Sequence, residues 1–312
     1  MLRLEILREH PSFFRSLTGL TGEEFEERFA RFLPVWQQQE RERLSRPDRR
    51  RAIGGGRKYR LPLQDRLLMT LLWLRPYWNI ETLAFFFGVD PATVRRNTRR
   101  VLSALQKLGL ASLGWPRPPR QGEGKTVEEV LEAFPDLLAI IDGTEQRIQR
   151  PQDDETRRQH SSGRRKAYTR KTIIVVDNTG RIRGVAPSAP GSQHDLKVAV
   201  ASGLMEQIPE SISVIGDAGF DGLQHYYPNR SIATPHKARR NHPLLPDQKL
   251  ANQELASMRM VVEHTLSRLK RFRILALVFR HMLSLYDSVL MAVVGMVNFL
   301  MERRCQKAES VA

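Results

Sequence analysis

The chain has 312 residues, 41% of them hydrophobic, and carries 50 Lys and Arg against 34 Asp and Glu, a formal net charge of +16. Its length leaves room for two domains, and the clustered, arginine-rich charge favours a polyanionic partner over a merely solvated basic surface. A single cysteine, Cys305, excludes an intramolecular disulfide and a cysteine-based zinc site, and favours a reducing cytoplasm. The longest apolar stretch, residues 289–301, contains Asn298 and is too short to span a membrane, so it predicts a buried helix.

Residues 1–60 predict a helical N-terminal segment followed by a basic linker. Thr21 and Glu24 have the spacing of a capping box before an apolar run, so we expect a helix to begin there. Residues 41–60 then hold nine Arg or Lys against two acids, with three consecutive glycines and no apolar periodicity. This composition indicates either a solvated linker or an arm that lies along phosphates.

Residues 61–115 have the pattern of an all-α helix-turn-helix domain. A leucine-rich helix that ends near Pro76 is followed by a short helix at 81–87, a turn at Gly88 and a third helix that Pro91 opens. The alternative is a small helical bundle with a charged surface. The polar side of the third helix predicts contacts with DNA through Arg95, Arg96 and Arg99.

Residues 135–305 predict a mixed α/β domain, behind a Pro- and Gly-rich boundary and a short helix at 127–134. Asp177-Asn178-Thr179-Gly180 is a strong hairpin-turn signal, so the first strands should form a meander before the first crossover helix. We expect Asp195 to cap that helix. Strands are expected at 137–142, 172–176, 181–185, 212–216 and 232–234, and helices at 195–207, about 250–273 and 284–304.

Three carboxylates on separate elements predict a site for two divalent cations. Asp142 follows the apolar run 137–141, and Asp217 follows the run 212–216. A turn-forming Asp is the alternative at each position, because Gly143 follows the first and the second is part of Asp-Ala-Gly-Phe. Divalent metals need hard oxygen ligands on rigid elements, and in a strongly basic chain such ligands indicate phosphodiester chemistry on nucleic acid.

Glu263 is the third carboxylate and lies within a long helical pattern. At 100° per residue, Arg259 and Lys270 fall within about 40° of it, on one polar stripe beside the apolar one. The alternative is an exposed Arg–Glu pair, worth a few tenths of a kcal/mol. We interpret the two cations as groups that hold DNA phosphates beside a metal-binding carboxylate.

Residues 147–171 form a basic segment, with nine Arg or Lys against three acids. It predicts a solvated loop or, because of its place beside Asp142, a clamp for DNA phosphates with Tyr168 available for base stacking. His194 is interpreted as a loop histidine rather than a metal ligand. The DNA-binding candidates of this segment are Arg164, Arg165 and Lys166.

The chain contains three short motifs: Asp-Gly-Thr at Asp142, Asp-Ala-Gly-Phe at Asp217, and Arg259-x3-Glu263-x6-Lys270, with spacers of three and six residues. Together they resemble the motifs of the DDE transposases of bacterial insertion sequences. The closest group is the Harbinger-like one that includes insertion sequence five. The resemblance covers nearly the whole chain and implies a ribonuclease-H-like catalytic domain behind the helix-turn-helix domain. It implies that Asp142, Asp217 and Glu263 are catalytic and bind two Mg²⁺ ions, with Mn²⁺ as an alternative. The family signature begins with a tyrosine where this chain has Ala256, a departure that concerns strand processing.

The resemblance implies a transposase of an insertion sequence. Such a protein binds double-stranded DNA at the terminal repeats of its element and at the target, hydrolyses phosphodiesters and transfers strands. We expect a cytoplasmic, nucleoid-associated homodimer or higher oligomer with no membrane partner. Two alternatives come from other classes: a catalytically idle, domesticated transposase that acts as a DNA-binding regulator, and a ribonuclease-H-like nuclease without strand transfer.

Overall fold

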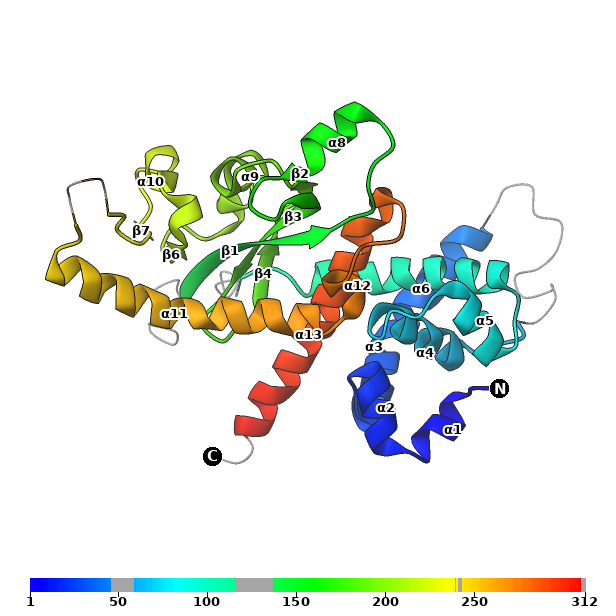
Figure 1. Cartoon of the computed structure of the whole chain (residues 1–312). Helices are drawn as coiled ribbons and strands as arrows, with labels where there is room; N and C mark the ends of the chain where they lie inside the picture. The colour runs from blue at the N-terminus through cyan, green and yellow to red at the C-terminus, as the bar shows by residue number, and fades with distance from the viewer. Residues whose placement is uncertain (46–58, 116–136, 239, 241–242, 310–312) are drawn as a thin grey trace. The chain divides into compact units, whose positions relative to one another are not determined.

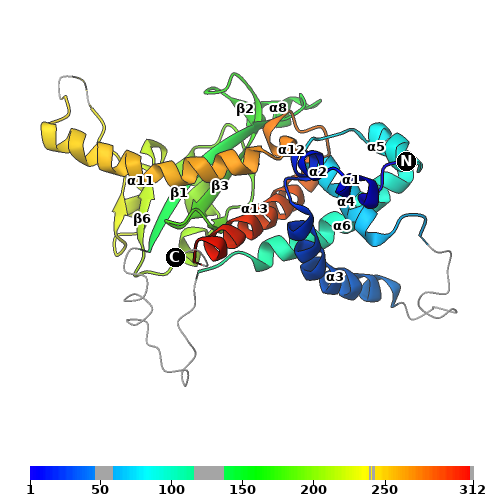
Figure 2. The same cartoon turned by 90° about the horizontal axis from the view of Figure 1, so that it is seen from below.

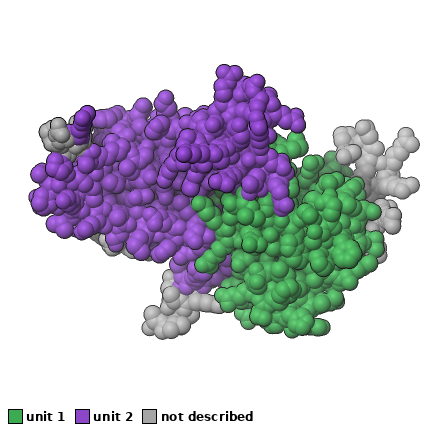
Figure 3. Space-filling view, viewed as in Figure 1, with its two compact units in different colours: residues 1–111, 270–277, 281–299 green, residues 112–269, 278–280, 300–312 purple. Residues whose placement is uncertain are grey.

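The computed structural model describes residues 1–45, 59–115, 137–238, 240 and 243–309, and the structural statements below concern these residues. The chain divides into two compact units (Figure 3). The first unit comprises residues 1–111, 270–277 and 281–299, and the second comprises 112–269, 278–280 and 300–312. The predicted helix at 127–134 and most of the basic linker lie outside the described residues.

The first unit is helical, as the sequence predicts. Thr21 begins α3 with a capping box, in which its hydroxyl accepts from the Glu24 N–H at 3.2 Å and the Glu24 carboxylate accepts from the Thr21 N–H at 2.8 Å. The helices of this unit before its C-terminal segments are α1 (Leu4–Arg8), α2 (Pro11–Thr18), α3 (Gly22–Leu44), α4 (Leu63–Leu74), α5 (Ile80–Phe87) and α6 (Pro91–Ala111) (Figure 1).

The α5–α6 pair has the order of elements expected for a helix-turn-helix. Gly88 ends α5 in the left-handed conformation, with φ of 64°, which a glycine adopts without steric cost. Val94 and Val101 of α6 are fully buried. Three arginines of α6 are exposed, as the predicted DNA-binding face requires: Arg95, Arg96 and Arg99.

Two C-terminal elements, α12 (Arg273–Ala276) and most of α13 (Tyr286–Glu309), belong to the first unit, although the sequence places them in the range 135–305. α12 is tied to this unit by a hydrogen bond from the Arg273 N–H to the Arg75 carbonyl, and α13 by a close approach of two glycines: a Cβ on Gly295 of α13 would lie 2.7 Å from the Cα of Gly109 in α6. α13 is long and apolar enough to cross a membrane, but 67% of its most apolar window is buried inside the protein. It is a core helix, as predicted for residues 289–301.

The second unit is built on a mixed sheet with the strand order β2-β3-β1-β6-β7. β4 and β5 also pair with β3. β1, β3 and β4 form the predicted antiparallel meander. The pairs β1–β6 and β6–β7 are parallel. The mixed α/β class is therefore confirmed. The strands are β1 (Leu138–Arg147), β2 (Ser161–Ser162), β3 (Ala167–Val176), β4 (Ile182–Val185), β5 (Ala189–Pro190), β6 (Ser213–Gly216) and β7 (Ile232–Ala233).

The helices of this unit cover the sheet and its edges. Buried side chains of β1, β3, β6 and α9 form one apolar core that also includes Phe220. Figures 1 and 2 agree that the long helix α11 runs along one side of the sheet. The basic segment 147–171 is not a single loop, because it contains α8, β2 and the first residues of β3. The helices are α8 (Asp154–His160), α9 (Asp195–Ala201), α10 (Leu223–Tyr226) and α11 (Pro246–Lys270).

Candidate active site

Asp142 lies inside β1 and not at its end. The strand continues to Arg147, with Asp142 opposite Ile174 of β3 in the antiparallel ladder. The predicted end of this strand at residue 142 is therefore wrong, and the alternative of a turn-forming role for Asp142 is excluded. Asp142 is 9% exposed, and its carboxylate accepts one backbone hydrogen bond, from the Gly143 N–H at 2.7 Å. β1 holds this acid between two neighbouring strands.

Asp217 is placed beside Asp142 by the register of the parallel pair β1–β6. Ile141 is opposite Gly216, so each aspartate directly follows one member of a paired couple on strands about 4.8 Å apart. The Asp217 carboxylate also accepts from the Gly219 N–H at 2.8 Å and begins a 3₁₀ turn at 218–220. The turn-forming interpretation is thus correct for Asp217, and this role leaves its carboxylate next to that of Asp142.

Burial and neighbouring negative charge perturb the acid pair. Burial raises the pKa of Asp142 from 3.8 to about 6, the Gly143 hydrogen bond opposes this rise, and the charge of Asp217 adds to it. Arg259 lowers this pKa and Asp195 raises it, both by smaller amounts. A buried carboxyl group with acidic neighbours and one backbone donor is short of positive charge, so the site around Asp142 and Asp217 favours a cation.

Asp195 is a member of this acidic group that sequence reasoning missed. It is the first residue of α9, whose N-cap is His194, so the expectation that Asp195 caps the helix is wrong. Its Oδ2 atom lies 3.3 Å from the position of a Cβ on Gly143 and 3.1 Å from that of a Cβ on Gly219. Asp195 therefore reaches both glycines near the two aspartates. The sequence around it signals only the start of a helix.

Lys171 of β3 balances part of this negative charge. Its ammonium lies 2.7 Å from Asp195 Oδ1 and 3.6 Å from Glu145 Oε1, and its side chain is 9% exposed. It also donates to the Gln193 carbonyl, so it connects β3 to the loop before α9. A cavity of about 330 Å³ opens beside these groups, and Arg164 lines it together with Lys171 and Asp195.

Glu263 lies on an exposed part of α11, while Val262, Leu266 and Leu269 of the same helix are buried. Arg259, one turn earlier, is half-buried and influences the pKa of Asp142; its Nε atom has no hydrogen-bond partner among the described residues. Within the same described part of the chain, no three His, Cys, Asp or Glu side chains are grouped so that they could share one metal ion. The structure thus brings Asp142 and Asp217 together, but it does not bring Glu263 to them.

The remaining sequence-predicted cations near the acids in the sequence are exposed. Lys270 is the last residue of α11 and is exposed. The turn between β2 and β3 exposes three consecutive cations, of which Arg164 reaches the cavity beside the acids: Arg164, Arg165 and Lys166. His194 is exposed at the rim of the same cavity, and its side chain makes no capping hydrogen bond to α9.

Comparison with known proteins places the chain in a family. The model of the DDE superfamily endonuclease matches residues 141–298, about half of the chain, a range that begins one residue before Asp142 and includes both other predicted acids. Two relatives are each 27% identical over 227 residues, 72% of this chain. One is the "Probable transposase for insertion sequence element IS702" of Microchaete diplosiphon, of which 76% is covered. The other is the "Putative transposase for insertion sequence element IS112" of Streptomyces albus G, of which 75% is covered.

No solved structure matches the chain. The two relatives nevertheless cover most of the chain, and the family match spans the strands and the helix that carry the acids. The predicted resemblance to insertion-sequence transposases is thereby confirmed, and the chain belongs to the family of DDE superfamily endonucleases.

Proposed function

We propose that this protein cuts double-stranded DNA at the ends of its insertion sequence and transfers the strands, with Asp142, Asp217 and Glu263 as its catalytic residues. One observation supports this above the others: two aspartates directly follow the last residue pair of the parallel strands β1 and β6, and Asp142 is short of positive charge. Such an intact pair argues against an idle transposase that acts as a regulator. A nuclease without strand transfer is the remaining alternative.

The acid pair fits divalent cations, because its donors are hard carboxylate oxygens and its negative charge is only partly balanced by the surrounding side chains. We propose that Asp142 and Asp217 hold Mg²⁺ or Mn²⁺, two ions in all when Glu263 joins them. Bound at this site, the ions would supply a nucleophile at neutral pH and stabilise the oxygen that leaves the phosphorus.

Glu263 and Arg259 share one flank of α11, since they are one helical turn apart. Arg259 lowers the pKa of Asp142, and this influence supports a role at the two aspartates for the flank of α11 that carries Glu263. We propose that Arg259 holds a scissile-strand phosphate there and that Lys270, farther along the same stripe, holds a neighbouring one. A cation fixed beside the reacting phosphate orients the strand for in-line attack.

The exposed cations of both units supply candidate DNA contacts. We propose that α6 recognises the element ends through Arg95, Arg96 and Arg99, and that the β2–β3 turn holds DNA near the acids through Arg164, Arg165 and Lys166. Reversing the charge of the three α6 arginines should weaken binding and flatten its salt dependence, by a slope of about 0.9 per lost phosphate contact. Recognition of two ends requires a homodimer or a higher oligomer on DNA, which we expect in the cytoplasm on the nucleoid.

The test is a cleavage assay on a supercoiled plasmid that carries the candidate element ends, incubated with the full chain and Mg²⁺. End-specific nicks or double-strand breaks, followed by joining to a second plasmid, support transposition. Breaks without joining support the nuclease alternative. End binding without any break, in either Mg²⁺ or Mn²⁺, contradicts the proposed catalysis and leaves a DNA-binding regulator.

A further inference from the structure

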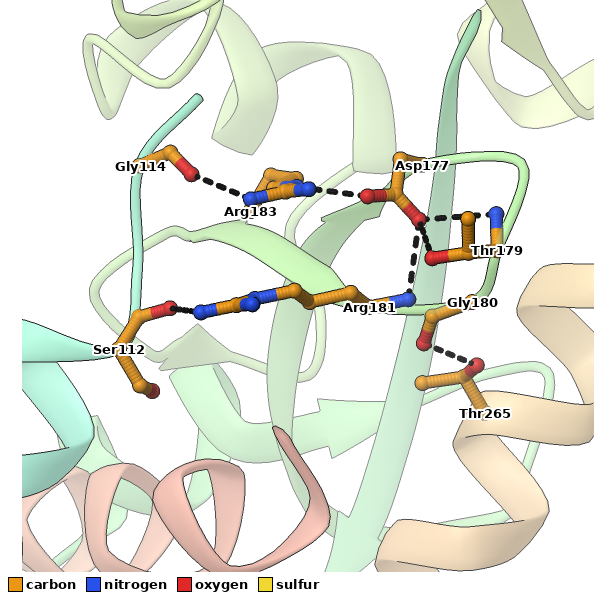
Figure 4. A network of polar contacts seen from close by, with 8 residues as sticks. All are labelled: Ser112, Gly114, Asp177, Thr179, Gly180, Arg181, Arg183 and Thr265. Carbon is orange, nitrogen blue, oxygen red and sulfur yellow. Dashed lines mark hydrogen bonds and ion pairs between the residues drawn. The ribbon is translucent and has the colours of Figure 1, made fainter. Parts of the chain in front are cut away.

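Asp177, the first residue after β3, is fully buried and organises the turn between β3 and β4 (Figure 4). Its Oδ1 atom accepts from the N–H groups of Thr179 at 2.9 Å and Arg181 at 3.1 Å, and from the Thr179 hydroxyl. Its Oδ2 atom lies 2.6 Å from Arg183 Nε. The sequence predicts only a hairpin turn here, and these contacts make the turn rigid.

The two arginines of this turn extend the network to a third segment, residues 112–114. Arg183 donates to the Gly114 carbonyl at 3.0 Å, and the Gly114 N–H donates to the Arg183 carbonyl at the same distance. Arg181 donates to the Ser112 carbonyl at 3.5 Å (Figure 4). The turn is therefore held from one side by the start of the second unit.

On its other side the turn contacts α11. The Thr265 hydroxyl donates to the Gly180 carbonyl at 2.9 Å, and Thr265 is fully buried (Figure 4). Gly180 has a φ of 85°, and a Cβ at this position would lie 3.0 Å from the Thr265 hydroxyl oxygen. Glycine is required here both by its conformation and by the closeness of the helix. The contact thus has little room for adjustment.

This contact lies across α11 from the candidate catalytic flank. Relative to Val262 on the buried face, Thr265 points about 60° to one side, whereas Arg259 and Glu263 point about 60° and 100° to the other. A hydrogen bond at one edge of the buried face fixes the rotation of the helix about its axis. That rotation decides where the opposite edge, with Arg259 and Glu263, is directed.

We propose that Asp177 and Thr265 are positioning residues, which hold α11 in the rotation that directs Glu263 and Arg259 toward Asp142. Asp177 acts through the turn, and Thr265 acts through its bond to the Gly180 carbonyl. The inference rests on the proposed function, in which Glu263 acts together with Asp142 and Asp217. It adds that a buried network on the other side of the helix sets the geometry of the site.

The experiment compares Thr265→Val, which keeps the shape and loses the donor, with Thr265→Ser, which keeps the donor. Thr172→Val is the matched control, because Thr172 is equally buried and its hydroxyl has no hydrogen-bond partner among the described residues. Two measurements need no DNA. The first is the distance between spin labels on Arg158→Cys and His264→Cys, both exposed sites, in a Cys305→Ser background. The second is Mn²⁺ affinity, from the signal of free Mn²⁺.

Thr265→Val should shift or broaden the label distance and weaken Mn²⁺ binding by about tenfold, as loss of a residue that orients metal ligands does. Thr265→Ser and Thr172→Val should match the unsubstituted protein. An unchanged label distance in folded Thr265→Val overturns the proposal. If Thr265→Val does not fold, Gly180→Ala tests the same contact by crowding it. Absence of Mn²⁺ binding in the unsubstituted chain contradicts the proposed function instead, and the label distance still decides the positioning role.

Discussion

Asp142 inside β1 and Asp177, the first residue after β3, are both buried aspartates, yet their surroundings differ. Asp177 is fully buried and receives Arg183 together with three hydrogen bonds from its own turn. Asp142 is nearly as buried, but it accepts one backbone hydrogen bond and faces the negative charges of Asp217 and Asp195. A buried carboxylate with a full set of partners stabilises a fold, and one without them costs free energy.

The number of hydrogen-bond and ion-pair partners, and not the degree of burial, distinguishes the structural Asp177 from the candidate catalytic Asp142. Both aspartates occur in sequences that resemble turns, Asp142 before Gly143 and Asp177 before Asn178-Thr179-Gly180. The acid that does form the turn is the compensated one. The acid inside the strand remains uncompensated, which is the pattern expected where a cation or substrate completes the site.

The largest expected effect concerns the proposed triad. Asp142→Asn, Asp217→Asn and Glu263→Gln should each lower Mg²⁺-dependent cleavage at least about ten-thousandfold, a barrier increase of ~5 kcal/mol, because each removes a metal-binding oxygen. Binding to DNA should be largely retained. Cleavage assays and gel shifts on the same preparations measure both properties.

The matched control for the triad is Asp221→Asn, an exposed acid in the loop after Asp217, which should cleave normally. A triad variant that cleaves at nearly the rate of the unsubstituted protein would remove that residue from the site. This outcome is most informative for Glu263, because the structure leaves it exposed and apart from the two aspartates.

Features with local causes could be predicted from the sequence. The capping box at Thr21, the start of α6 at Pro91 and the turn at Gly180 depend on residues within four positions of one another. The position of Asp217 after β6 follows in the same way from one apolar run and the glycine after it. For the candidate site, this means that Asp142 and Asp217 could be identified as candidates before their neighbours were known.

Features that depend on distant residues could not be predicted. β1 continues past Asp142 because its ladder with β3 continues, and no signal within β1 shows this. The ion pair of Asp195 with Lys171 joins residues 24 positions apart in sequence. The packing of α13 with α6 depends on a glycine in each helix, Gly295 and Gly109. The direction of the Glu263 side chain likewise depends on the contacts of α11.

The second prediction removes the cation that compensates Asp177. Arg183→Met should destabilise the protein by about 3–5 kcal/mol, because it leaves the buried Asp177 carboxylate without its cation. The free energy of unfolding in urea measures the loss. Adding Asp177→Asn to the same chain should recover part of it, since the buried charge is then removed as well. A loss below about 0.5 kcal/mol, the range of ordinary surface changes, would show that the network adapts without the pair.

The third prediction concerns Asp142, the uncompensated aspartate, and here the substitution should raise the stability of the protein. The pKa of Asp142 is about 6 in the folded protein against 3.8 as its ordinary value, so the folded state binds the proton more tightly. This group therefore lowers stability as the pH rises from about 4 to above 6. Asp142→Asn should stabilise the metal-free protein at pH 8 by up to about 3 kcal/mol, the equivalent of this pKa rise.

The stabilisation by Asp142→Asn should diminish below pH 6. It should vanish near pH 4, where the Asp142 carboxyl group becomes protonated in both the folded and the unfolded state. Urea unfolding in EDTA across this pH range measures it. Glu206→Gln, at a carboxylate that accepts a hydrogen bond from Tyr227, is a control that should show no such gain. If Asp142→Asn is equally stable or less stable at pH 8, Asp142 has partners that the structure does not show, and the contrast with Asp177 fails.

The smallest effect concerns Arg259, which lowers the pKa of Asp142 without a direct ion pair among the described contacts, whereas Arg183 forms an ion pair with Asp177. If Arg259 holds a DNA phosphate, Arg259→Ala should slow cleavage by at least about tenfold, a barrier increase of about 1.4 kcal/mol, and Lys270→Ala should act in the same direction. The melting temperature of Arg259→Ala should barely change, because the Arg259 Nε atom has no hydrogen-bond partner among the described residues. Lys249→Ala, exposed on the same helix, controls for a general loss of positive charge. An Arg259→Ala variant that melts much earlier yet cleaves normally at low temperature would make Arg259 a structural partner of Asp142, like Arg183 for Asp177.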